Sequence, residues 1–180
     1  MKSNLRKDPI MLRAPEPEDV DLLYDWENEP SLWHLSNTRT PFSRFDLEQY
    51  ILNSEKDIYQ ARQARFMIIL QEEGGDKGIG TVDLFDFDPY NKRAGIGILI
   101  VEGYRKKGFA GKTLDIILDY CKNQLGMHQL YCNITEGNDS STRLFENKGF
   151  RRIGTKKEWA LINQQWQDEN MFQLIFREKD

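Results

Sequence analysis

The chain has 180 residues, with 25 lysines and arginines against 29 aspartates and glutamates, which gives a formal net charge of -4. This length suffices for one domain with its own hydrophobic core, and the slightly acidic balance argues against a general affinity for nucleic acids or anionic membranes. Only two histidines and two cysteines are present, without a CxxC pair, which argues against a metal site, a Ser-His-Asp triad and a disulfide framework.

A single domain over residues 1–180 is therefore expected, with Cys121 and Cys132 as buried thiols. The N-terminus has no apolar signal region, and no segment approaches the roughly 18 apolar residues needed to span a membrane. We accordingly expect a cytoplasmic protein with no membrane or nucleic-acid partner and no metal.

A short strand followed by an acidic helix is predicted near the N-terminus. Residues 10–13 fit a strand, and the segment 15–30, PEPEDVDLLYDWENEP, has apolar side chains at helical spacing at Val20, Leu23 and Trp26. Pro30 is expected to end this helix, because proline cannot continue the helical hydrogen-bond ladder.

A second helix is predicted over residues 43–54, where the hydroxyl of Ser43 can cap the helix N-terminus. The connection before it, SLWHLSNTRTPF at residues 31–42, mixes aromatic and polar side chains. Such a loop serves either to bind a ligand or to pack against the domain, and we favour packing.

Three strands are predicted next, at residues 65–71, 78–88 and 94–101. The stretches between them, EEGGDKG and PYNK, are short and rich in turn residues, which favours antiparallel pairing. No helix follows the glycines of the first stretch, so they predict a hairpin turn and not a nucleotide-binding loop. The third strand contains Gly95 and Gly97, which indicates a bulge or a close approach of another segment.

The third strand leads into the loop RKKGFA at residues 105–110, and the triplet GKT that follows is typical of the end of a P-loop. A P-loop requires a glycine five positions before Gly111, where this chain has Lys106. The alternative is an R-x-x-G-x-A loop opening a helix, in which small residues let the backbone approach a bulky anion. Three cations would then lie at the positive end of the helix dipole, where they are either ordinary solvated charges or the partners of a phosphorylated ligand: Arg105, Lys106 and Lys107.

The rest of the chain is predicted to contain a helix, a strand, a short helix and two long strands. The first helix covers residues 110–125 and ends before Gly126, and the short helix covers residues 139–148 and ends at Gly149. The strands are expected at residues 128–135, 150–162 and 166–177. Strands and helices in this order predict an α+β domain.

This order and three segments resemble the GNAT superfamily of N-acetyltransferases. The segments are the strand AGIGILIV, the loop RKKGFA and the sequence NDSSTRLFENKGF at residues 138–150. The similarity covers nearly the whole chain and is best from Arg65 onward. It implies an acyl-CoA N-acyltransferase fold, with a mostly antiparallel mixed sheet flanked by helices, and acetyl-CoA as the acetyl donor. Members of the family are often dimers or larger, so the resemblance also allows a homo-oligomer.

The resemblance implies a set of cofactor contacts. In the family the R-x-x-G-x-A loop binds the pyrophosphate of acetyl-CoA, and the glycine-containing strand pairs with its pantetheine arm. Carried over to this chain, these contacts fall on Ile98, Leu99, Ile100, Arg105, Lys106, Lys107, Gly108, Phe109 and Ala110. Asn138 and Ser141 match family positions near the thioester end of the cofactor. From the residues alone, a helix cap and an ordinary first-turn residue are the favoured interpretations of these two.

Acetyl transfer to an amine needs an acceptor for the proton of the amine and a proton donor for the departing CoA thiolate. Many relatives supply the donor from a tyrosine seven residues after the asparagine, but here that position is Phe145, which cannot donate a proton. Relatives of the ribosomal-protein N-terminal type also lack this tyrosine, and the chain resembles them at this helix. Ser141 or a bound water is therefore the candidate donor.

Asp83 and Asp86 in the strand GTVDLFDFD are the candidates for amine binding, and Asp83 is also the candidate base. The resemblance supports this, because spermidine N-acetyltransferases carry carboxylates at similar places and an anionic pocket suits a polyamine. The odd spacing puts the two on opposite faces of a regular strand, so only one can face the cleft unless a bulge intervenes. Exposed aspartates of an edge strand are the alternative. Glu27 is a further candidate for amine binding.

The residues and the resemblance together predict an acetyl-CoA-dependent N-acetyltransferase that acts on a small-molecule or peptide amine. The acidic residues slightly favour a polyamine such as spermidine. The missing tyrosine and the pattern around Phe145 favour the alternative of Rim-type transfer to a protein N-terminus. A non-catalytic CoA-binding sensor is the alternative from another class.

Overall fold

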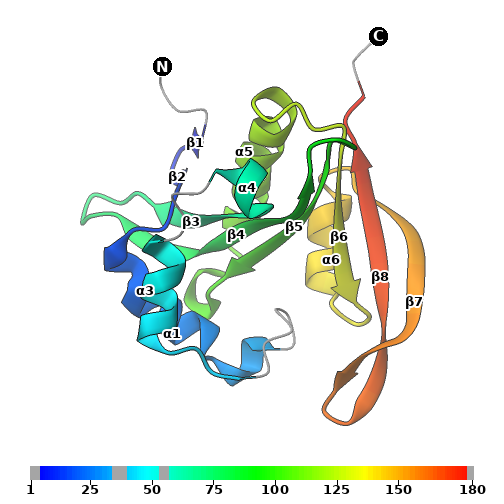
Figure 1. The fold of residues 1–180 in the computed structure, drawn as a ribbon, viewed down its shortest axis with the longest axis horizontal. Helices are drawn as coiled ribbons and strands as arrows, with labels where there is room; N and C mark the ends of the chain where they lie inside the picture. Colours follow the sequence, from blue (N-terminus) through cyan, green and yellow to red (C-terminus); the bar gives the residue numbers. More distant parts are fainter. Residues whose placement is uncertain (1–4, 34–39, 53–56, 178–180) are drawn as a thin grey trace.

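The computed structural model describes residues 5–33, 40–52 and 57–177, in which an eight-stranded sheet is flanked by helices (Figure 1). The strand order is β1-β2-β3-β4-β5-β6-β8-β7. Every neighbouring pair is antiparallel except β5 with β6, which is parallel. This confirms the predicted α+β class and the mostly antiparallel mixed sheet.

The strands are β1 Arg6–Lys7, β2 Ile10–Arg13, β3 Ala64–Leu70, β4 Lys77–Asp88, β5 Arg93–Ile100, β6 Gln129–Thr135, β7 Arg151–Ile162 and β8 Gln165–Ile175. The helices are α1 Val20–Glu27, α3 Arg44–Leu52, α4 Ile58–Ala61, α5 Phe109–Asn123 and α6 Asp139–Glu146, with 3-10 turns η1 Pro17–Asp19, η2 Pro30–Leu32 and η4 Glu102–Tyr104. Each predicted element has a counterpart. The sequence pattern does not predict β1 and α4, because two and four residues are too short to show a period.

The N-terminal helices differ in detail from the prediction. The segment predicted as one helix starts as the turn η1, and α1 already ends at Glu27, so Pro30 begins η2 instead of ending α1. Ser43 caps α3 as predicted, because its hydroxyl accepts a hydrogen bond from the N–H of Asp46 at 3.0 Å. Residues 53 and 54 of the predicted helix lie outside the described residues.

The loop predicted at residues 31–42 is described only at its two ends, since residues 34–39 lie outside the described residues. Near its start, the indole N–H of Trp33 donates to the carbonyl of Glu27 at 2.9 Å. Near its end, the side chain of Asn28 exchanges two hydrogen bonds with the backbone of Phe42, at 2.8 and 3.0 Å. Both described ends therefore pack against α1 and the residue that follows it.

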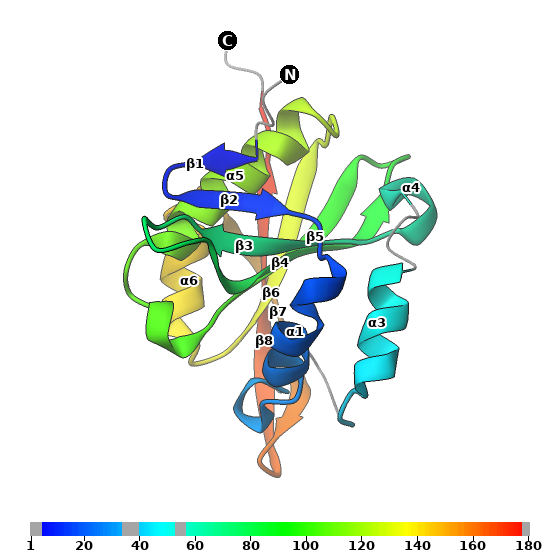
Figure 2. The ribbon, with the colours of Figure 1, turned by 90° about the vertical axis from the view of Figure 1, so that its left-hand side faces the viewer.

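Alternate side chains of β3 divide the core into two clusters on opposite faces of the sheet. Phe66, Ile68 and Leu70 pack with apolar residues of α5 and α6. Met67 and Ile69 pack against α1 and α3, which lie side by side in Figure 2. Both predicted buried thiols belong to the first cluster, where burial raises the pKa of each to about 12.

The sheet opens into a fork between β5 and β6. These strands pair only where residues 93–95 meet residues 129–131. Beyond that point β5 pairs with β4 alone, β6 continues along β8, and the two strands diverge (Figure 1). The edge of β5 over residues 96–100 consequently has no neighbouring strand, so its backbone groups can pair with an extended ligand.

Gly95, in the last paired rung of the fork, confirms the predicted close approach. A Cβ atom built on it would lie 2.1 Å from Cε2 of Phe85, whose ring covers the glycine. The same ring makes an edge contact with Tyr131, with 5.9 Å between the ring centroids. The bulge lies in the neighbouring strand, where the register of β4 shifts between Phe85 and Asp88.

Substituting Gly95 with alanine is expected to lower the free energy of unfolding by about 1–3 kcal/mol, because the new methyl group overpacks the ring of Phe85. Denaturant unfolding measures this. The matched control is Gly97→Ala in the same strand, where the nearest atom to a new Cβ is 3.9 Å away. Equal stability of the two variants would mean that Phe85 does not cover β5.

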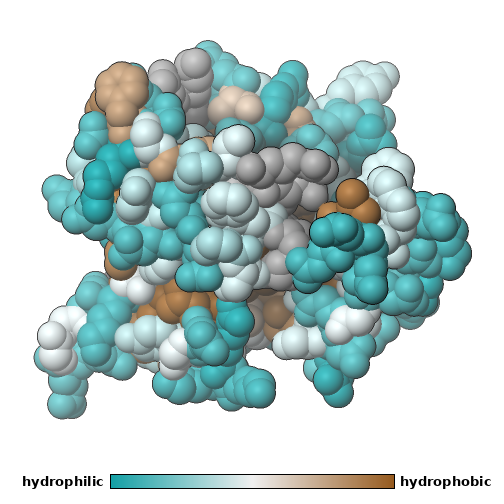
Figure 3. Space-filling model, turned by 90° about the horizontal axis from the view of Figure 1, so that it is seen from below, coloured by the Kyte–Doolittle hydropathy of each residue, from teal (hydrophilic) through white to brown (hydrophobic). Residues whose placement is uncertain are grey.

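The surface seen from below is mostly hydrophilic, with a few separated hydrophobic patches (Figure 3). Within the described parts of the chain, no helix is long and apolar enough to cross a membrane.

Candidate active site

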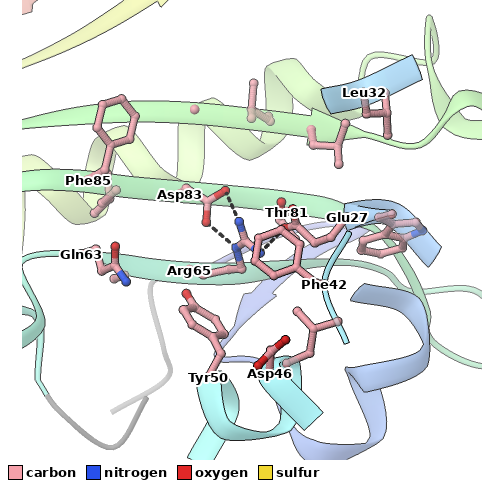
Figure 4. Close-up of a pocket in the computed structure, with 17 residues that line it drawn as sticks. Glu27, Leu32, Phe42, Asp46, Tyr50, Gln63, Arg65, Thr81, Asp83 and Phe85 are labelled. Carbon is pink, nitrogen blue, oxygen red and sulfur yellow. Dashed lines mark hydrogen bonds and ion pairs between the residues drawn. The ribbon is translucent and has the colours of Figure 1, made fainter. Parts of the chain in front are cut away.

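A pocket of about 680 Å³ lies on the face of β3, β4 and β5 that carries α1 and α3 (Figure 4). Aromatic side chains supply much of its wall: Trp26, Phe42, Tyr50 and Phe85. Its charged residues are Glu27 from α1, Asp46 from α3, Arg65 from β3 and Asp83 from β4. Three carboxylates and one guanidinium leave this lining with a net charge of -2. The pocket therefore favours cationic ligands with apolar portions.

Arg65 forms ion pairs with two of the pocket carboxylates, Asp83 and Glu27, here called the inner carboxylates. Its Nε and Nη2 donate to the two oxygens of Asp83, at 2.6 and 3.3 Å, and its Nη1 donates to Glu27 (Figure 4). The guanidinium also lies over the ring of Tyr50, 5.6 Å from its centroid. Since four separate elements meet at this group, Arg65 fixes α1 and α3 against the sheet.

The positive charge of Arg65 is stabilised by its carboxylate partners. Burial alone would lower the pKa of Arg65, but the carboxylates of Asp83 and Glu27 outweigh burial and raise this pKa. Burial in the same cluster raises the pKa of the Tyr50 hydroxyl, with the charge of Arg65 partly offsetting it. Within the pocket the guanidinium is a cation and the phenol is neutral at physiological pH.

Gly97 forms an opening between the pocket and the fork. It lies directly opposite Asp83 in the pairing of β4 with β5, on the open part of the β5 edge. A Cβ atom at this position would face the pocket, with only Cε1 of Phe85 within 4 Å. Ile98 and Leu99, next in the strand, also line the pocket. The pocket thus reaches the unpaired edge of β5 at Gly97, the one residue of that edge without a side chain.

The loop after β5 and the start of α5 lie at the far end of that edge. Gly108 is the N-cap of α5 in the left-handed conformation, with φ of 81°, and no side chain caps the helix. The first N–H to bond within the helix belongs to Lys112, so the N–H groups before it are free for an anion. Arg105 donates to the carbonyl of Ile100 at 2.8 Å, which folds this loop back onto the strand.

A family model of the acetyltransferase (GNAT) domain matches residues 10–151. This chain belongs to that family. It is a GNAT N-acetyltransferase, and the family uses acetyl-CoA. The open edge of β5 and the uncapped N-terminus of α5 fit the elongated pantetheine arm and the pyrophosphate of this cofactor.

Comparison with individual proteins points to two kinds of relative. An uncharacterised N-acetyltransferase, p20 of Bacillus licheniformis, is 28% identical over 170 residues, which is 94% of each chain. A spermidine N(1)-acetyltransferase of Vibrio cholerae is 27% identical over 169 residues, which is 92% of each chain. The crystal structure of the Vibrio cholerae spermidine N-acetyltransferase in complex with CoA and spermine covers 94% of this chain and 96% of its own, with a TM-score of 0.83 and 24% identity.

The remaining loop residues of this N-acetyltransferase surround the α5 N-terminus. Lys106 is exposed, and its backbone is in the left-handed conformation, with φ of 61°. The ammonium of Lys107 donates a hydrogen bond to the carbonyl of Gly103 at 2.8 Å. Phe109 and Ala110 form the first turn and pack against the larger core cluster. The structure thus brings the six predicted loop residues together with Ile100 at the end of β5.

Asn138 and Ser141 begin α6. The side-chain oxygen of Asn138 accepts a hydrogen bond from the N–H of Ser141 at 3.1 Å, so Asn138 is a helix N-cap. Phe145 is buried, with its ring packed edge-on against Phe150 at 5.0 Å between centroids. The position of the tyrosine used by many relatives is therefore part of the core here.

Changing Ser141 to alanine is expected to lower kcat by about 10²-fold if its hydroxyl protonates the leaving thiolate. The KM for acetyl-CoA should stay nearly unchanged, since the backbone N–H that completes the cap is retained. Ser140→Ala, at the exposed neighbouring position, is the control. Unchanged kcat in Ser141→Ala would assign the proton to water.

The two strand aspartates have separate environments. Asp83 lines the pocket, whereas Asp86 is exposed beyond it, in the β4 bulge, with φ of 49°. The carboxylate of Asp86 accepts a hydrogen bond from the hydroxyl of Tyr131 at 2.8 Å. Burial and this bond raise the pKa of Tyr131 to about 12. Only one of the two aspartates therefore faces the pocket.

Sequence reasoning missed Arg65, Asp46, Tyr50 and the special place of Gly97. One signal for Arg65 was present, because an arginine beside the apolar run of a buried strand needs a carboxylate partner. Its partner Asp83 is directly opposite in the pairing of β3 with β4. Asp46 and Tyr50 depend on how α3 packs, and Gly97 depends on where the ring of Phe85 lies, neither of which a local pattern reveals.

Proposed function

We propose that this N-acetyltransferase transfers the acetyl group of acetyl-CoA to a primary amino group of a polyamine such as spermidine. The observation that carries the proposal is the pocket, which combines a net charge of -2 with aromatic walls. A polyamine has several ammonium groups on a flexible alkyl chain, so it matches both the carboxylates and the rings. The similarity to the Vibrio cholerae spermidine enzyme supports the same acceptor class.

The cofactor contacts follow from the fork and the α5 N-terminus. We assign the pantetheine arm to the backbone of residues 98–100 and the pyrophosphate to the N–H groups that follow Gly108. Lys106 and Lys107 would add positive charge beside the pyrophosphate. When bound, acetyl-CoA supplies an acetyl group activated as a thioester. Asn138 and Ser141 remain proposed contacts near its reactive end.

The pocket then orients the acceptor amine, and the proton of that amine must be removed. The amino group would approach past Gly97, where no side chain blocks the β5 edge. Asp83 is a poor candidate for the base in this geometry, because both its oxygens already accept hydrogen bonds from Arg65. We therefore assign Asp83 to the binding of the acceptor and the removal of the proton to water. Ser141 remains the proposed donor to the thiolate.

Phe145 favours a second candidate function, transfer to the α-amino group of a protein. An α-amino group has a pKa near 8, well below the roughly 10 of an alkyl amine, so it requires less help in losing its proton. The link of Phe145, which is buried, to this acceptor is that relatives of the ribosomal-protein N-terminal type also lack the tyrosine.

The test is release of free CoA thiol from acetyl-CoA in the presence of spermidine, spermine or short peptides with free N-termini. Turnover with the polyamines and not with the peptides is the expected result. Turnover with peptides alone would replace the proposal by the second candidate. Thermal stabilisation by CoA without turnover in any arm would favour a CoA-binding sensor.

A further inference from the structure

The charged residues of the pocket form two groups, one at each end. At the inner end, beside Gly97 and the β5 edge, Arg65 lies between Asp83 and Glu27 (Figure 4). At the outer end is Asp46 on α3, whose side chain is exposed. Together with Tyr50, these are the charged and titratable groups that line the pocket among the described residues.

The chemistry of transfer places opposite demands on the two ends. The amino group that attacks a thioester must be neutral, because an ammonium has no lone pair to offer. A free carboxylate beside that amino group would stabilise the ammonium, whereas a nearby cation disfavours it. The remaining amino groups of a polyamine stay protonated and need a carboxylate. A cation that offsets the inner carboxylates, together with a carboxylate at the outer end, meets both demands.

Arg65 suits the inner position because a guanidinium keeps its charge at every pH at which the enzyme can work. Only 20% of its side chain is exposed, and its ion pairs with Asp83 and Glu27 hold it in place. Without this cation, two carboxylates would face the opening at Gly97 unpaired. The ion pairs therefore reduce the formal charge of the inner end from -2 to -1, which weakens the stabilisation of the reacting amine as an ammonium.

We propose that Arg65 is a positioning residue that pairs both inner carboxylates, so that the pocket admits a neutral amino group at Gly97 while a second, protonated amino group of the same acceptor lies at Asp46. This inference rests on the proposed polyamine function. It narrows the acceptor class to amines that carry a second cationic group, and it assigns recognition of that group to α3.

The test follows kcat at saturating spermidine from neutral to alkaline pH in three variants, because kcat reports the pKa of the bound amine whereas kcat/KM reports the free enzyme and the free amine. Arg65→Gln is expected to move the midpoint of the profile about one unit to higher pH, a roughly tenfold loss near neutrality that alkaline pH restores. Arg65→Lys keeps a cation and should keep the wild-type midpoint. Asp83→Asn removes a carboxylate and should move the midpoint to lower pH, which tests the proposal even if Arg65→Gln does not fold.

A fourth variant, at Asp46, distinguishes the role of the outer end of the pocket from that of the inner end. Asp46→Asn retains a side-chain oxygen to cap α3, and it should raise the KM for spermidine while leaving the pH midpoint unchanged. Stabilisation by CoA verifies that each variant is folded. Loss of rate at all pH values with unmoved midpoints would overturn the inference and leave Arg65 a structural residue. Absence of spermidine turnover in the wild type would instead refute the proposed function itself.

Discussion

Replacing Gly108 with valine is expected to raise the Kd for CoA at least tenfold, a loss of about 1.4 kcal/mol or more of binding free energy. The residue is the N-cap of α5, and no atom lies within 4 Å of a Cβ built there, so the new side chain would occupy open space at the start of the helix. A branched side chain at this point would block the approach of a pyrophosphate. Isothermal titration with CoA measures the effect.

The left-handed backbone at Gly108 complicates this experiment, because valine is strained at a φ of 81° by about 1–2 kcal/mol. Gly126 provides a matched control beyond the other end of α5. It has a φ of 61° and equally open surroundings, so Gly126→Val carries similar strain far from the proposed cofactor loop. Equal loss of CoA affinity in both variants would show that strain, and not the blocking of the loop, is the cause.

Replacing Gly97 with valine is expected to reduce acetyl transfer by at least about 10²-fold, because a small misplacement of reacting groups costs a rate factor of this size. The Cβ would enter the pocket without a clash, and the side chain would fill the opening beside the β5 edge. Stability and CoA affinity should persist, since valine favours strands. Steady-state kinetics with the best acceptor measures the rate of acetyl transfer, and titration with CoA measures the affinity for CoA.

Gly154→Val in β7 is the matched control, because this glycine also lies in a strand with no atom within 4 Å of a built Cβ. It should retain full activity. Normal turnover in Gly97→Val would show that the acceptor does not reach the cofactor past this residue.

The two glycines of β5 show where prediction from the sequence stops. The pattern GIG marks a strand in which something comes close, and the structure agrees at Gly95, which Phe85 covers. At Gly97, two residues on, the same lack of a side chain opens a pocket. Only the position of a ring from β4 distinguishes the two, and that position depends on register and on a bulge.

Part of the candidate site could be predicted from the sequence, and part could not. The loop at residues 105–110 and the start of α5 are contiguous in the sequence, so their turn chemistry and helix periodicity were sufficient to find them. The charge cluster joins residues separated by 18 and 38 positions, in Arg65 with Asp83 and with Glu27. Such a cluster forms only once the sheet is ordered and α1 has packed on it, which local patterns do not encode.

The most direct test of this account is a crystal structure of the protein with CoA and spermine. The account predicts the pyrophosphate at the N-terminus of α5, the thiol end of the pantetheine arm beside Gly97, and spermine in the pocket with one amino group at Gly97 and another near Asp46. Spermine bound outside this pocket, or a CoA thiol directed away from Gly97, would contradict it.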